Sequence, residues 1–298
     1  MSANLLKLIS IKICTVLIIV ILENSMKCEC AICKDNKPFE MPEEIVDAAI
    51  RGDIVLFCGA GISTESVNVL HSFYNDISDE LKTEDKDITF SALMQRYCSQ
   101  VDGRKKLLKR IKDRFDYINS FPELERQATA FHRELAEIYS IRTIITTNWD
   151  TYFEDYCGAT PIVMPQDCAF WDDHSRLVIK MHGSINNISS IIATTDDYKK
   201  CLKQLRNGTI GSRIKILLTT KTVVFIGFSF EDEDFSQIIA YLRKEMGSVY
   251  PHIYFVTLDN TLSERLNFKN STTIVTSGTN FVHQLKLRLI EKGAIKYC

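Results

Sequence analysis

Residues 54–63 read IVLFCGAGIS, an unbroken apolar run that ends in a glycine turn. The run from Ile54 to Phe57 is typical of a strand buried on both faces of a parallel sheet. Gly59 and Gly61 follow directly, and a backbone without side chains lets a phosphate approach closely where a helix begins. A tight strand-to-helix connection would use the same residues, so this stretch alone leaves both interpretations open.

Outward from this strand, short apolar runs alternate with helical patterns along most of the chain. A helix is expected over Glu43–Arg51, just before the first strand. Further strands are expected at Thr143–Thr146, Leu177–Lys180, Thr222–Ile226 and Ile253–Val256, and further helices at Phe131–Tyr139, Asp197–Leu205, Phe235–Lys244 and Phe281–Ile290. Strand and helix in alternation predict an α/β fold, a Rossmann-like doubly wound parallel sheet. A chain of 298 residues with 45% hydrophobic residues is long enough for one such core.

A helical insertion interrupts this alternation. We assign residues 42–298 to one domain and interpret about 67–127 as an insertion, because that stretch is helical, polar and partly basic. Basic residues from Arg104 to Arg114 alternate there with apolar ones, which predicts a helix with one apolar stripe and one basic face. A solvated face explains this pattern better than a nucleic-acid patch, and the net charge of −2 gives no overall attraction for nucleic acid.

Residues 1–41 form a separate N-terminal segment with an apolar stretch and a cysteine cluster. Ile13–Leu22 is nearly all apolar and follows two lysines, so it is a membrane anchor, a signal sequence or upstream sequence that is not translated. Cys28, Cys30 and Cys33 present three thiols, either to one metal ion or as plain free thiols. The ten cysteines of the chain, several within apolar runs, favour a reducing compartment.

The motif TTNWD at residues 146–150 follows the strand that begins at Thr143. Asn148 and Asp150 can offer an amide and a carboxylate to one small polar ligand. An Asx-turn that caps the next helix would use the same residues, so the motif alone does not establish a ligand site.

Two more polar loops follow strands. In KMHGS at residues 180–184, His182 stands just past a strand end, where the near-neutral pKa of histidine suits a general base, although a lone histidine is more often structural. In GFSFED at residues 227–232, Ser229 can donate a hydrogen bond to a ribose or a phosphate. Loops at the carboxyl ends of parallel strands open onto one crevice, so the four motifs together predict a ligand site better than any one of them.

In this order, the motifs GAGIS, TTNWD, KMHGS and GFSFEDED resemble the sirtuin superfamily, specifically its sirtuin-like branch found in bacterial antiphage defence proteins. The resemblance runs from about Pro42 to Phe235. It implies an enzyme that binds NAD as substrate and cleaves the bond to nicotinamide. It also implies that the dinucleotide phosphates contact Gly59, Ala60, Gly61 and Ser63, that the nicotinamide and its ribose contact Asn148 and Asp150, that the catalytic base is His182, and that the adenosine side contacts Gly227 and Ser229.

The sequence departs from protein-deacylating sirtuins at two places. Those enzymes carry paired C-x-x-C motifs for zinc after the H-G motif, whereas Cys201 is the only cysteine between His182 and Gly227 here. Residues 66–71, SVNVLH, also replace the family's G-I-P-D-F-R segment. Since the zinc module frames the acyl-lysine groove, the resemblance implies that this chain lacks the deacylase-type module and that water accepts the ADP-ribosyl group.

The expected function is therefore an NAD glycohydrolase that releases nicotinamide and ADP-ribose in antiphage defence. An NAD-dependent deacylase or ADP-ribosyl transferase is the enzymatic alternative, and a non-catalytic sensor of NAD or ADP-ribose is the third interpretation. Because an uncontrolled NAD hydrolase would harm its own cell, and the chain leaves little room for a sensor domain, we expect a homo-oligomer or a regulatory partner. The cytoplasm is the expected location, with a membrane anchor through residues 5–22 as the alternative.

Overall fold

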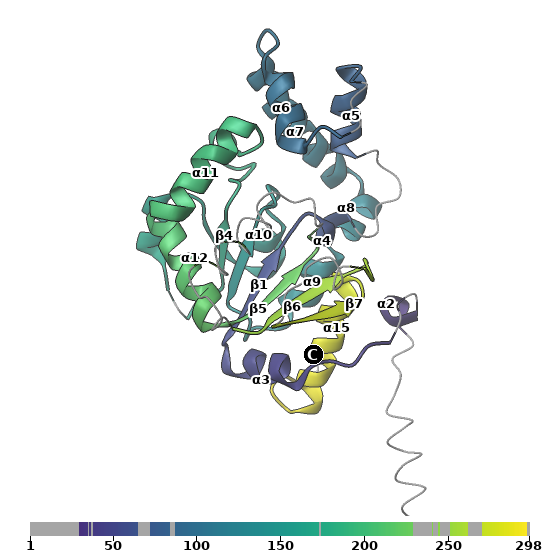
Figure 1. Cartoon of the computed structure of the whole chain (residues 1–298). Helices are drawn as coiled ribbons and strands as arrows, with labels where there is room; N and C mark the ends of the chain where they lie inside the picture. Colours follow the sequence, from purple (N-terminus) through teal and green to yellow (C-terminus); the bar gives the residue numbers. More distant parts are fainter. Residues whose placement is uncertain are drawn as a thin grey trace, which may run out of the picture. The chain divides into compact units, whose positions relative to one another are not determined.

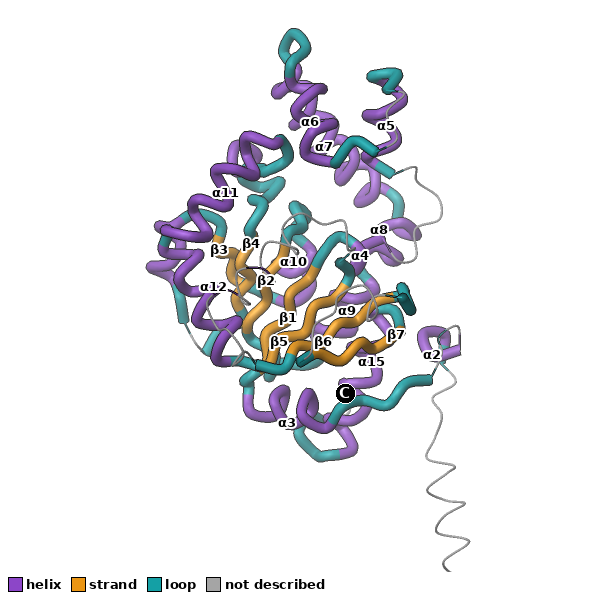
Figure 2. The backbone as a smooth tube through the Cα atoms, viewed as in Figure 1, coloured by secondary structure: helices purple, strands orange, loops and turns teal. Residues whose placement is uncertain are grey.

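The computed structural model describes most of the chain, over residues 30–34, 36, 38–64, 72–83, 87–172, 174–228, 240, 244, 251–261 and 270–296. The chain divides into two compact units, Met1–Pro38 and Phe39–Cys298. The second unit holds a parallel sheet with helices packed against it (Figure 1, Figure 2). Within the described part of the chain, no helix is both long and apolar enough to cross a membrane, and residues 5–22 lie outside that part.

The sheet has seven strands in the order β3-β4-β2-β1-β5-β6-β7, and every neighbouring pair is parallel. The strands are β1 (Ile54–Cys58), β2 (Thr143–Thr146), β3 (Thr160–Ile162), β4 (Leu177–Lys180), β5 (Thr222–Ile226), β6 (Ile253–Thr257) and β7 (Ser271–Val275). The five strands predicted from apolar runs are confirmed, as is the Rossmann-like doubly wound α/β fold. The two edge strands were not predicted.

Two apolar clusters lie on opposite faces of the sheet, because side chains alternate along each strand. In β1, Ile54 and Leu56 belong to the cluster that also contains residues of α3 (Glu43–Arg51), α9 (Ala130–Ala136) and α15 (Gly278–Glu291). Val55 and Phe57 belong to the other cluster, which contains residues of α12 (Thr209–Thr220). β1 is thus buried on both faces, as its continuous apolar run predicts.

The helices agree with the sequence prediction in most places. The predicted helix Glu43–Arg51 is α3, and the helices predicted near 131–139, 197–205 and 281–290 are α9, α11 (Thr195–Asn207) and α15. Helix α12 was not predicted, and most of the helix predicted at Phe235–Lys244 lies outside the described residues. Among the described residues, this unit also has the α-helices α4 (Gly61–Thr64), α5 (Phe73–Glu80), α6 (Phe90–Cys98), α7 (Gly103–Ser120), α8 (Pro122–Ala128) and α10 (Tyr152–Cys157).

Helices α5, α6 and α7 pack into a third apolar cluster between β1 and β2 in the sequence. Residues of these helices, such as Leu93 and Leu107, pack there with Ile191 and Trp149, which follow β4 and β2. The helical stretch therefore packs directly against the loops of two predicted motifs. An apolar contact therefore joins these helices to the loops after β2 and β4.

The basic face of α7 is largely paired with acidic side chains. Lys109 and Lys112 pair with acidic residues one turn along the same helix, Asp113 and Asp116. Arg104 differs from the predicted solvated face, because its guanidinium donates to Asp197 Oδ2 at 2.8 Å and to the Ile191 carbonyl oxygen at 2.6 Å. Arg104 therefore ties α7 to α11 and to the segment that precedes it.

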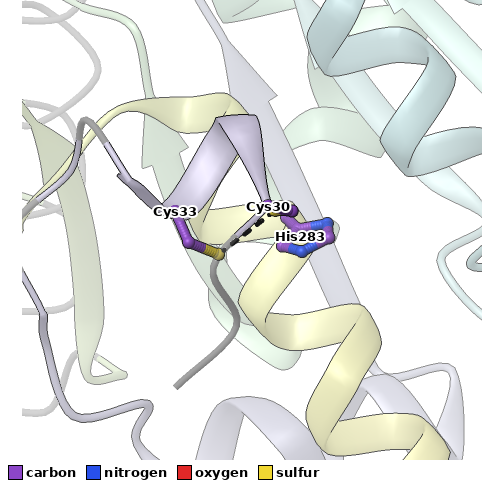
Figure 3. A group of neighbouring side chains, drawn as sticks. All are labelled: Cys30, Cys33 and His283. Carbon is purple, nitrogen blue, oxygen red and sulfur yellow. Dashed lines mark hydrogen bonds between the residues drawn. The ribbon is translucent and has the colours of Figure 1, made fainter. Parts of the chain in front are cut away.

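In the first unit, the short helix α2 (Ala31–Lys34) carries part of the cysteine cluster. Cys30 and Cys33 lie with their sulfur atoms 3.5 Å apart (Figure 3). Cys28 lies outside the described residues, so a metal site and plain free thiols both stay as predicted alternatives.

Candidate active site

The glycine turn after β1 packs tightly against the end of β5. The Gly61 N–H donates to the Gly227 carbonyl oxygen at 2.9 Å, and the Gly59 N–H donates to the Ile226 carbonyl oxygen at 2.9 Å. A Cβ atom on Gly59 would lie 2.6 Å from the Gly227 oxygen, and one on Gly61 would lie 2.7 Å from the Gly227 Cα. Gly227 itself has a φ of 72°, a conformation that favours glycine. The turn after β1 and the turn after β5 therefore meet without side chains between them.

Ser63 is the third residue of α4, a helix of a single turn that begins at Gly61. Its side-chain oxygen is buried and makes no hydrogen bond within the described residues. A buried hydroxyl without a partner carries a desolvation cost, on the order of 1–3 kcal/mol, unless a ligand or water satisfies it. The Ser63 hydroxyl is thus open to a polar ligand beside the glycine turn.

The loop after β2 is fixed by the hydroxyl of Thr146. This hydroxyl donates to the Cys58 carbonyl oxygen at 2.9 Å and accepts from the Asn148 N–H at 3.0 Å. The loop is therefore tied to the end of β1, which is the neighbouring strand.

The side chain of Asn148 is buried, and its amide makes no hydrogen bond to the described residues. The residue is only 7% exposed, and neither Oδ1 nor Nδ2 makes a hydrogen bond within the described part of the chain. The amide lies near enough to Asp150 to help lower the pKa of that carboxyl, yet it does not reach hydrogen-bond geometry. A buried primary amide offers donors and an acceptor together, which is the pattern that another carboxamide would complement.

Asp150 has a structural part in the same loop. Its Oδ1 accepts from the Tyr152 N–H at 3.1 Å, so the Asx-turn that the sequence offered as an alternative is present at the start of α10. Burial raises the pKa of the Asp150 carboxyl, while the ammonium of Lys180 opposes this rise. A role toward a ligand would thus be added to a turn-forming one.

His182 lies in the loop after β4, beside the loop after β2. The Met181 N–H donates to the Thr146 carbonyl oxygen at 2.9 Å, and the Ile192 N–H donates to the His182 carbonyl oxygen at 3.0 Å. The imidazole is buried and lies edge-on to the Tyr198 ring, with the ring centroids 5.0 Å apart. Backbone bonds on both sides therefore hold the histidine at the edge of the sheet.

The predicted motifs meet at one edge of the sheet because their strands are neighbours. They follow β4, β2, β1 and β5, which lie side by side in this order, and parallel strands share one carboxyl edge (Figure 2). The chain order reverses at β1, where ligands bind in doubly wound sheets. The structure thus places Gly59, Ala60, Gly61, Ser63, Asn148, Asp150, His182 and Gly227 at this edge. Ser229 lies outside the described residues.

One charged residue at this edge was not predicted from the sequence. Lys180, the last residue of β4, has a side chain that is 0% exposed, and its Nζ lies 3.1 Å from Glu154 Oε1. A lysine at the end of an otherwise apolar strand was the signal that could have drawn attention to it.

Known families and proteins are similar to this chain over the residues that form this edge of the sheet. The family model of the SIR2-like domain matches residues 142–276, which include the loops after β2, β4 and β5. NAD(+) hydrolase ThsA of Cytobacillus dafuensis is 30% identical over 212 residues, which cover 69% of this chain and 41% of that protein. The protein of the same name from Enterococcus faecium is 30% identical over 205 residues, which cover 66% of this chain and 41% of that protein.

Two more distant similarities extend the comparison. Defense-associated sirtuin 2 of Bacillus subtilis is 21% identical over 238 residues, which cover 76% of this chain and 23% of that protein. A solved structure from work on the mechanism and regulation of Sir2 enzymes aligns with 84% of this chain and 100% of its own, at 16% identity and a TM-score of 0.43.

The chain spans only 41% of the length of each of the two NAD(+) hydrolases, so their names do not transfer to it directly. The matching family model and these relatives nevertheless agree with the motifs at the sheet edge. Residues 142–276 thus match the SIR2-like domain family, and the chain is similar to proteins of the sirtuin-like branch of the sirtuin superfamily.

Proposed function

We propose that this chain is an NAD glycohydrolase that converts NAD and water into nicotinamide and ADP-ribose. The observation that carries the proposal is the buried, uncommitted amide of Asn148, which lies at the same sheet edge as the glycine turn. The relatives named NAD(+) hydrolase support the choice of substrate.

The glycine turn would receive the pyrophosphate. The absence of side chains on Gly59, Gly61 and Gly227 lets the turns after β1 and β5 pack together. The pyrophosphate would lie beside these joined turns, at the carboxyl edge of the sheet. Helix α4 has only four residues, and its dipole adds little, so the Ser63 hydroxyl is the more specific contact in this proposal.

Asn148 would hold the carboxamide of the nicotinamide group. Its amide can donate to the carboxamide oxygen and accept from the carboxamide nitrogen, which would satisfy both buried groups at once. Fixing the ring in this way aligns the bond between nicotinamide and C1′ of the ribose. Alignment matters because the leaving group is cationic when bound and departs neutral, so no general acid is required.

His182 would then serve as the general base. The bond between C1′ and the nicotinamide nitrogen breaks with its electron pair going to nitrogen, and an oxocarbenium-like transition state forms. The oxygen of water bonds to C1′, and His182 takes the proton that this water loses and passes it to solvent. A positioned base of this kind contributes roughly a hundredfold to ten-thousandfold in rate.

A role in antiphage defence, control by self-association or a partner, and a cytoplasmic location are part of the same proposal. The names of two kinds of relative, NAD(+) hydrolase and defense-associated sirtuin, support the defence role. Activity measured over a range of protein concentrations tests control by self-association, since a monomer that is fully active at low concentration would contradict it.

Release of nicotinamide from NAD by the purified full chain tests the reaction. We expect release by wild type and a loss of at least about a hundredfold in Asn148→Ala and in His182→Ala. Asn186→Ala and His174→Ala are matched controls because both residues are exposed, and they should retain wild-type activity. No release at any concentration of protein, together with tight NAD binding, would replace the hydrolase with a sensor. Release that requires an acyl-peptide would replace it with a deacylase.

A further inference from the structure

Lys180 has a fully buried ammonium group at the carboxyl end of β4. The Nζ atom donates to the main-chain carbonyl oxygen of Asp150 and pairs with Glu154 Oε1 at 3.1 Å. Removing an ammonium from water carries a large desolvation cost, which must be offset by its partners. One of these partners is the backbone of the loop that carries Asn148.

The lysine joins three elements of the candidate active site. It belongs to β4 and precedes His182 by two residues, it bonds the loop after β2 through Asp150, and it pairs with α10 through Glu154. Asp150 is then held twice, since Lys180 binds its carbonyl oxygen and the Tyr152 N–H binds its carboxylate. These two bonds hold the end of the loop at Asp150, whereas the Thr146 hydroxyl holds its start.

Stability alone does not account for such a pair. Replacing a buried ion pair by apolar side chains of similar volume is often neutral or stabilising, so an apolar pair could fill this space. An apolar pair could not bond the Asp150 carbonyl oxygen. The distinctive contribution of the ammonium is therefore the orientation of the loop.

The surrounding charges are consistent with this role. Burial raises the pKa values of Asp150 and Glu154, and Lys180 opposes both rises. Burial and the same ammonium lower the pKa of His132 to about 3, so this neighbour is neutral near pH 7. Burial raises the pKa of Tyr152 above its usual range, so its hydroxyl is neutral as well. Lys180 is thus the positive charge that faces Asp150 among these groups.

We propose that Lys180 is a positioning residue of this site, whose ammonium holds the Asp150 backbone and so fixes Asn148 and the Asp150 carboxylate relative to His182. This inference rests on the proposed NAD glycohydrolase function. It assigns the lysine no contact with the substrate.

The test compares Lys180→Met, the double variant Lys180→Met with Glu154→Leu, and Lys286→Met. Lys286 is a matched control, since its ammonium is also largely buried and pairs with two glutamates, Glu134 and Glu137. The double variant removes both charges, so we expect it to unfold at the denaturant midpoint of wild type. We expect both Lys180 variants to lose kcat on the order of a hundredfold with little change in KM for NAD, because a misplaced loop affects alignment most. Lys286→Met should keep the wild-type kcat.

A pH profile adds a readout that a purely structural role would not move. In the proposed reaction the ionised Asp150 carboxylate contacts the nicotinamide ribose. Without the ammonium this carboxyl loses the charge that opposes its burial, so the acid limb of the kcat profile should move to higher pH in both Lys180 variants. A double variant with the kcat and pH profile of wild type would overturn the proposal. Failure of both variants to fold would overturn it too, since the pair would then hold the fold and not the loop.

A measurement without turnover separates this inference from the proposed function. If wild type releases no nicotinamide, the glycohydrolase proposal fails, and the lysine is tested by NMR of aspartate labelled with ¹³C at the carboxyl carbon. Asp150→Asn identifies the Asp150 signal, and the proposal expects this signal to titrate at higher pH in the double variant than in wild type. Equal titration in the two proteins would refute the role of Lys180 whatever the activity.

Discussion

Replacing Gly61 with alanine tests how closely the turn after β1 packs against β5. The added Cβ would lie 2.7 Å from Cα and 2.8 Å from the carbonyl oxygen of Gly227, and both of these are backbone atoms that cannot rotate away. Overpacking of this kind costs about 1–3 kcal/mol, and weakening the 2.9 Å hydrogen bond from the Gly61 N–H adds about 0.5–1.5 kcal/mol. Alanine regains about 0.5–1 kcal/mol through lower backbone entropy, which leaves a net loss of roughly 1–3 kcal/mol.

Urea unfolding of the full chain measures this loss, and nicotinamide release measures its effect on the site. Gly158→Ala is the control, because Gly158 has a φ of 61° but nothing within 4 Å of an added Cβ. It should lose about 1 kcal/mol through backbone strain and keep its activity. Gly61→Ala should lose stability and most of its activity, since the two turns must move apart. A Gly61→Ala protein with the stability and activity of wild type would refute the close packing of the two turns.

Two further changes test contacts away from the glycine turn. Burial lowers the pKa of His132 from 6.5 to about 3, so between these pH values the imidazole binds a proton in the unfolded chain but not in the folded one. The free energy of unfolding therefore falls as the pH drops from 6.5 to about 3, by up to about 1.4 kcal/mol per pH unit. His132→Leu should remove this contribution, so unfolding measured from pH 7 to pH 4 should show a shallower fall than wild type, and an identical fall would contradict a buried neutral imidazole. Arg104→Met should lower the free energy of unfolding by about 1–3 kcal/mol and reduce activity, because it releases the segment after His182. Lys109→Met, which removes an exposed ion pair, is the control and should change the free energy of unfolding by less than about 0.5 kcal/mol in the same assay.

The strands that the sequence predicts are those with a continuous apolar run. β1, β2, β4, β5 and β6 lie inside the sheet, where both faces are covered and each position favours an apolar side chain. The edge strands lack this pattern. β3 has three residues with Pro161 at its centre, and β7 reads STTIV. Neither strand therefore has the apolar composition that is typical of a buried strand.

The candidate site could be predicted as a set of loops but not as a set of contacts. Strand periodicity and the glycine turn place each motif at a strand end, and parallel pairing then brings the ends together. The bond from Lys180 to the Asp150 backbone depends on tertiary packing, which no spacing in the sequence encodes. The same holds for Arg104, which the sequence places on a solvated basic face. In the structure it joins α7 to Asp197 of α11 and to the Ile191 carbonyl oxygen.

Helices α5, α6 and α7 belong to an excursion of the chain between β1 and β2, which are hydrogen-bonded neighbours in the sheet. The entropy of closing such an excursion grows only with the logarithm of its length, so residues can be added or removed there with little effect on the register below. During evolution this stretch can therefore change faster than the strand ends, provided that an apolar surface for Trp149 and Ile191 is kept. Differences in substrate access or control among related proteins are expected to accumulate in these helices, while the chemistry stays with the loops of the sheet.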